Sequence, residues 1–194
     1  MGFNLAVLAV TGNNLDTVLR NLDLNRTGQA EDFPDSPISA TTLPSGMHAV
    51  CYMTRQAAVP QKDQLTKLSK RETVLCLEVS ETVMNSSLTA WKNGKELWSV
   101  WHDASYQGTD HLETTGPLPE EFESIRQRQM KLQAQQDQEL DAAWPVDHVF
   151  DIPVDMFVSL GGFRYDETLD FPNPWEILEP LPKKDKKWWQ FFSR

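Results

Sequence analysis

Apolar side chains recur with a period of two in some stretches and of about 3.6 in others, which predicts a sheet with helices interspersed. Residues 3–10 form a short apolar run typical of a buried strand, and residues 47–53 and 72–84 predict two further strands. Residues 13–24 and 62–71 predict short helices. Because strands follow one another through tight turns, we expect an α+β fold: a mainly antiparallel twisted sheet with three to four helices packed on it.

The tryptophan-rich stretch 88–103, LTAWKNGKELWSVWHD, predicts a hairpin that turns at Asn93-Gly94, because a type I′ turn needs positive φ at both central residues. Pairing outward from this turn sets Thr89 opposite Trp98 and makes Trp91 and Trp98 diagonal neighbours. Both faces of the ribbon are apolar: Trp91, Trp98, Val100 and His102 share one, and Leu88, Leu97 and Trp101 share the other. Such a ribbon is typical of a strand pair covered on both sides, by the core or in part by a partner.

The second half of the chain predicts another turn and short strand in residues 106–116 and two helices. Residues 116–144 predict a surface helix docked by its first half through a thin stripe that includes Phe122, Ile125, Met130 and Leu132. Residues 147–167 predict a strand end and a short helix, capped by Asp151 and ended by Gly161 or Gly162.

Two stretches are dominated by residues that favour loops. Residues 25–46 contain three prolines and two glycines among Ser, Thr and Asp, which predicts a long loop, a sub-boundary or a contact surface. Residues 166–187 are rich in proline and charge and predict an extended segment. We therefore expect a single α+β domain over residues 1–168, followed by residues 169–194 as a proline-rich segment with a basic and aromatic tail.

Charge is distributed unevenly over the 194 residues, whose formal net charge is −10. Residues 183–194 contain five basic and one acidic side chain, whereas residues 1–182 contain 13 basic and 27 acidic ones, a net −14. Such a body repels phosphate backbones, which argues against nucleic-acid binding. It attracts a basic partner at long range, unless the surplus serves solubility alone.

The two cysteines, Cys51 and Cys76, suit small buried thiols and are too few for a disulfide framework, which indicates a reducing cytoplasm. The N-terminal apolar run is about eight residues long and lacks a basic leader, so it does not resemble an export signal. No stretch approaches the roughly 20 apolar residues that span a bilayer.

Two polar clusters are candidates for chemistry. His102, Asp103, Asp110 and His111 would form a metal site if their side chains converged, but successive strand residues point to opposite faces, and a polar turn explains the same pattern. The second cluster places carboxylates beside a histidine and an arginine: Asp147, His148, Asp151, Asp155, Arg164, Asp166 and Glu167. Paired carboxylates run acid–base chemistry when their pKa values are split; capping and ion pairing are the alternative. No nucleotide-binding or nucleophile motif is present, and we expect no cofactor.

The tail KKDKKWWQFFSR carries four lysines ahead of Trp188, Trp189, Phe191 and Phe192. Lysines attract anionic headgroups and aromatic rings favour the bilayer interface, so weak contact with a membrane surface is one interpretation. Alternatively, the aromatic residues fold back over an apolar patch or dock in another subunit, while the lysines meet the acidic body.

Several segments together, in particular LCLEVSETVMNSS, WKNGKELWSVWHD, HLETTGPLPEEFESI and FDIPVDMFVSLGGFRYDE, resemble a family of uncharacterised bacterial proteins over about residues 3–168. The resemblance implies a bacterial cytoplasmic protein and supplies no activity or site residue.

These observations favour a non-enzymatic protein that binds another, basic protein; an acidic immunity-type protein that blocks a toxin is the most concrete form, and a homodimer is also compatible. The alternatives are a small metal-dependent hydrolase using the His102 cluster and a peripheral membrane protein anchored by its tail.

Overall fold

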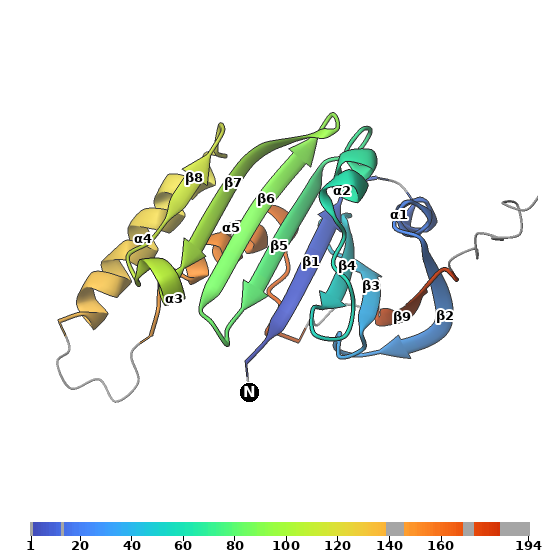
Figure 1. Ribbon diagram of the computed structural model, residues 1–194, viewed down its shortest axis with the longest axis horizontal. Helices are drawn as coiled ribbons and strands as arrows, with labels where there is room; N and C mark the ends of the chain where they lie inside the picture. Colours follow the sequence, from blue (N-terminus) through green and yellow to red (C-terminus); the bar gives the residue numbers. More distant parts are fainter. Residues whose placement is uncertain (1, 13, 139–145, 169–172, 183–194) are drawn as a thin grey trace, which may run out of the picture.

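The computed structural model describes residues 2–12, 14–138, 146–168 and 173–182. Nine strands form one sheet in the order β2-β9-β3-β4-β1-β5-β6-β7-β8, and every neighbouring pair is antiparallel (Figure 1). The strands are β1 (Asn4–Val10), β2 (Leu24–Glu31), β3 (Ile38–Thr42), β4 (His48–Met53), β5 (Val74–Ser80), β6 (Asn85–Lys92), β7 (Lys95–Asp103), β8 (Glu113–Thr115) and β9 (Trp175–Pro180). The expected antiparallel α+β architecture is confirmed, with a larger sheet than the pattern indicated.

Helices cover both faces of this sheet. The described residues form α1 (Leu15–Asn21), α2 (Lys62–Leu68), the single turn α3 (Ala104–Gln107), α4 (Glu121–Gln136) and α5 (Asp151–Gly161). Helices α4 and α5 lie against one face, and α1 and α2 against the other (Figure 1). None of the helices in the described ranges is long and apolar enough to cross a membrane.

The central strand β1 explains the continuous apolar run near the N-terminus. Leu5 and Val7 belong to the core beneath α4 and α5, whereas Leu8 and Val10 belong to the core beneath α1 and α2. A strand buried on both faces reads as unbroken hydrophobic sequence rather than alternation. Each side of the sheet therefore has its own core.

The hairpin turn is confirmed, but the register beyond it is not. Asn93 and Gly94 have φ of 54° and 74°, and Lys92 pairs with Lys95. A bulge follows, so Trp98 lies opposite Ala90 instead of Thr89. Trp98 consequently packs into the α4/α5 core and Trp91 into the α1/α2 core, and the predicted aromatic neighbours are on opposite faces.

The prediction of a long loop over residues 25–46 is wrong, because strands β2 and β3 occupy most of this range. Strand β9, in the segment expected to be extended, inserts between them. Most of β2 is exposed and polar, so it shows no alternation, and a register shift between Arg26 and Ala30 interrupts its pairing with β9.

The two long helices depart from expectation in their contacts. Leu132, expected in the apolar stripe of α4, is exposed, and Gln129 and Gln133 are buried instead. Asp151 is the first helical residue of α5 and not its cap. Gly162, with φ of 80°, ends α5 as predicted.

Candidate binding groove

His102, the residue on which the predicted metal cluster depends, is fully buried at the end of β7. Its Nδ1 lies 2.7 Å from the carbonyl oxygen of His111 and its Nε2 lies 2.9 Å from Oδ2 of Asp147. Burial by itself lowers the pKa of His102, but these two hydrogen bonds and the nearby negative charges outweigh it, and the pKa is raised from 6.5. Both ring nitrogens are therefore occupied within the protein.

Asp103 and His111 form local hydrogen bonds, and Asp110, the fourth member of that cluster, is exposed. The carboxylate of Asp103 accepts hydrogen bonds from the backbone N–H of Ser105 and Tyr106 and so caps α3. Nδ1 of His111 accepts the backbone N–H of Asp103 at 2.9 Å. No group of three His, Cys, Asp or Glu side chains within the described ranges is arranged to hold a metal ion. The structure brings the two histidines together, with ring centroids 6.1 Å apart, but not as a chelating set.

The second polar cluster is organised around Arg164. Its guanidinium forms ion pairs with Asp151 at 2.8 Å, Asp155 at 3.1 Å and Asp166 at 2.9 Å. Burial raises the pKa of Asp151, and Arg164 partly offsets the rise. Asp147 belongs instead to His102, so the carboxylates do not form one acid–base site. The arrangement ties α5 to the chain that follows it.

Replacing Arg164 with methionine should lower the free energy of unfolding by about 2 kcal/mol at pH 7, because three carboxylates lose their shared cation. The loss should shrink as the pH falls toward 4, because Asp151, whose pKa is already raised by burial, takes up a proton once Arg164 no longer opposes it. Chemical denaturation at both pH values measures it. Arg126→Met is the matched control, since its ion pair with Glu123 within α4 is exposed and contributes little; equal losses in the two variants would contradict this account.

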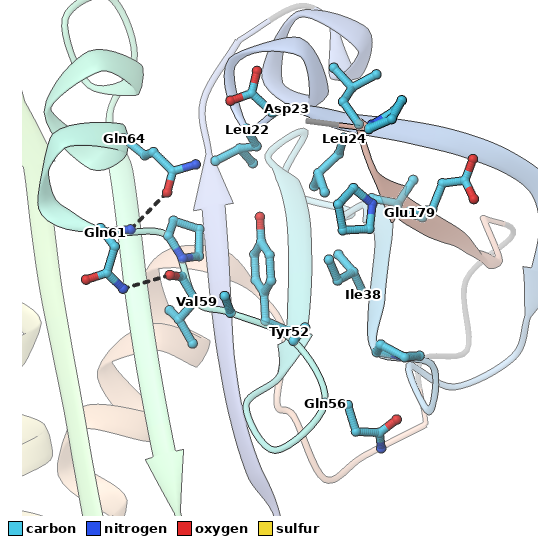
Figure 2. Close-up of a pocket in the computed structure, with 18 residues that line it drawn as sticks. Leu22, Asp23, Leu24, Ile38, Tyr52, Gln56, Val59, Gln61, Gln64 and Glu179 are labelled. Carbon is cyan, nitrogen blue, oxygen red and sulfur yellow. Dashed lines mark hydrogen bonds between the residues drawn. The ribbon is translucent and has the colours of Figure 1, made fainter. Parts of the chain in front are cut away.

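A groove of about 850 Å³ lies on the α1/α2 side of the sheet and is here called the Tyr52 groove. Its floor is Ile38 and Tyr52, and its walls come from three segments: residues 22–24 after α1, residues 56–61 and Gln64 around the start of α2, and residues 178–182 from the end of β9 (Figure 2). Most of this lining is apolar, with four prolines among it.

Local hydrogen bonds hold the walls in place. The backbone N–H of Gln61 donates to Oε1 of Gln64, and Nε2 of Gln61 donates to the carbonyl of Val59, both at 3.0 Å (Figure 2). On the opposite wall the N–H of Leu181 donates to the carbonyl of Asp23 at 2.7 Å. Asp23 has φ of 56°, a left-handed conformation that turns the chain sharply from α1 into β2. The groove is thus bounded by fixed backbone on two sides.

Polar groups in the Tyr52 groove are few. The Tyr52 side chain is 2% exposed, and its hydroxyl, which makes no hydrogen bond to a described residue, points toward the Leu22 end of the groove (Figure 2). The charged side chains among the described lining residues are Asp23 and Glu179, both exposed. An apolar hollow with a few polar groups and a negative rim is the form of a site for an apolar ligand that carries positive charge.

Sequence reasoning did not find this groove. The pattern places Tyr52 in a strand, Leu24 at the end of a helix and Leu178 within the extended segment 166–187. The signal that pointed to the site was the run of apolar residues and prolines at 178–182, LEPLP, which is unusual for a solvated linker. The contact residues predicted in the tail, Trp188, Trp189, Phe191 and Phe192, lie outside the described residues.

Comparisons with known proteins found no relative: no family model, no curated protein and no solved structure matches this chain. The resemblance to uncharacterised bacterial proteins stays a prediction. Any function is therefore argued from the groove itself.

Proposed function

We propose that this protein binds another protein and takes a basic, apolar segment of that partner into the Tyr52 groove. The observation that carries the proposal is the composition of the groove: apolar walls of fixed backbone with Asp23 and Glu179 on the rim. Apolar area supplies affinity, and the carboxylates select lysine or arginine over acidic side chains.

The charge of the rest of the chain supports the same partner. Residues 1–182 have a net charge of −14, so a basic protein is attracted from a distance before the groove is engaged. Inhibition of a basic toxin, the immunity-type role, is the most concrete form of this proposal. His102 and Arg164, the central residues of the two polar clusters, are engaged with their own neighbours, which favours a binding role over an enzymatic one.

Fluorescence anisotropy with labelled twelve-residue peptides tests the proposal on the full chain. A peptide of alternating lysine and leucine should bind at least about tenfold more tightly than one of alternating glutamate and leucine. The double variant Asp23→Lys with Glu179→Lys should abolish this preference. Glu113→Lys with Glu120→Lys, which makes the same change in net charge at the far edge of the sheet, should keep it. Equal effects of the two double variants would mean that net charge and not the groove selects the peptide.

A further inference from the structure

The last described residues of the chain form part of the groove wall. Pro180, Leu181 and Pro182 line the Tyr52 groove, and Leu181 is fixed to Asp23 by the backbone hydrogen bond described above. The segment 183–194 therefore starts at the mouth of the groove. Any ligand that enters the groove lies beside the first residues of this segment.

The composition of residues 183–194 matches what the groove selects. The segment has a net charge of +4 and contains Trp188, Trp189, Phe191 and Phe192 after four lysines. Aromatic side chains suit the apolar walls, and an indole N–H or the backbone can meet the unpaired Tyr52 hydroxyl. In the sequence, the four lysines stand between Pro182, which lines the groove, and the aromatic residues.

Reach and volume allow the contact. Trp188 is six positions after Pro182, and an extended chain of that length spans up to roughly 20 Å. A groove of about 850 Å³ is in the size range that encloses a drug-sized ligand, so it accommodates more than one aromatic ring. Because the segment is tethered at the mouth, its effective concentration at the groove is in the millimolar range or above.

We propose that the Tyr52 groove binds the aromatic residues 188–192 of its own chain, with the lysines of the tail against the acidic rim. This inference rests on the proposed function, since it assigns a regulator to the same site. The tail occupies the groove in the free protein, and a partner segment must displace it. A partner therefore binds more weakly than it would to an unoccupied groove.

A disulfide-trapping experiment on the full chain tests the contact. Ala58→Cys places a thiol on an exposed lining residue and Trp189→Cys places one in the tail. The native thiols do not interfere, because Cys51 and Cys76 are buried, and burial raises the pKa of Cys51 to about 12. The reference protein carries the same two cysteines with Trp188, Phe191 and Phe192 all replaced by serine. It keeps the tether but not the proposed anchors.

Intramolecular disulfide formation should be at least about tenfold faster with the aromatic residues than with the serines. Equal rates would show that the tail reaches Ala58 only by diffusion, and a disulfide between two molecules would place the tail in a second copy; either result overturns the proposal. Binding to vesicles of anionic phospholipid that requires the tail aromatic residues, together with equal trapping rates, would assign the tail to membrane surfaces instead.

The outcome is separable from the test of the proposed function. A variant in which Trp188, Phe191 and Phe192 are replaced by serine, with no added cysteine, should bind the lysine–leucine peptide about tenfold more tightly than the wild type. The reason is that the competing segment no longer occupies the groove. If the peptide binds both proteins equally, the groove is a binding site without a tail regulator. If it binds neither, the proposed function fails as well.

Discussion

Gly116→Ala should lower the free energy of unfolding by about 3 kcal/mol or more and release β8 from the edge of the sheet. An added Cβ at this position would lie 2.0 Å from the carbonyl oxygen of Leu97 and 3.0 Å from Cα of Trp98. Both contacts are with backbone atoms of β7, so no side-chain rotation relieves them. Gly116 also has φ of 71°, which a β-carbon disfavours. Chemical denaturation measures the loss.

Gly28→Ala is the matched control for that substitution. Gly28 lies in β2 with φ of 76°, close to the value at Gly116, but an added Cβ meets no atom within 4 Å. Gly28→Ala should lower the free energy of unfolding by only about 1 kcal/mol, because alanine is less favourable than glycine at positive φ. A comparable loss at the two positions would show that the close approach to Leu97 is not a constraint on β7 and β8.

Asp147→Ala should lower the free energy of unfolding by about 3 kcal/mol, because it leaves two buried hydrogen-bond donors without an acceptor. Oδ2 of Asp147 accepts from Nε2 of His102 at 2.9 Å, and Oδ1 accepts the backbone N–H of Phe150 at 3.1 Å. The side chains of His102 and Asp147 are 0% and 7% exposed, so water cannot replace the lost acceptor. The pair links β7 to the segment that leads into α5, and thermal or chemical unfolding should report its loss directly.

The pH dependence of this pair has a defined sign. The pKa of His102 is raised above 6.5 in the folded protein, so protonated His102 stabilises the fold. The difference in free energy of unfolding between wild type and Asp147→Ala should be complete below about pH 6.5 and should decrease as the pH rises through the folded pKa. Asp147→Asn, which keeps an oxygen acceptor but no charge, should lose less stability than Asp147→Ala. Its free energy of unfolding should depend less on pH than that of the wild type. A gap that widens as the pH rises would mean that His102 is neutral in the fold.

Residues with a strong local signal were placed correctly from the sequence. Positive φ at Asn93-Gly94 fixed the hairpin, and Gly162 ended α5. The apolar run 3–10 became the central strand because burial on both faces needs no alternation. Antiparallel α+β architecture followed from the order of these elements.

Errors arose where distant segments decide the outcome. The bulge in β7 places Trp98 on the opposite face of the sheet from Trp91, and no residue type between them is a signal for a bulge. Strand β2 is polar along most of its length and exists because β9, about 150 residues later in the sequence, pairs with it. His102 and Asp147 are 45 positions apart, so their contact could not be inferred from spacing. The Tyr52 groove depends on the same long-range pairing.

The Tyr52 groove, with its acidic rim, is the proposed place where a basic and apolar chain binds. The decisive measurement is the affinity of the lysine–leucine peptide for the wild type and for Asp23→Lys with Glu179→Lys, at low and at physiological salt. We expect salt-sensitive binding by the wild type and at least a tenfold loss of affinity in the rim variant. Unchanged affinity in the rim variant would contradict the claim and place any binding surface elsewhere on the molecule.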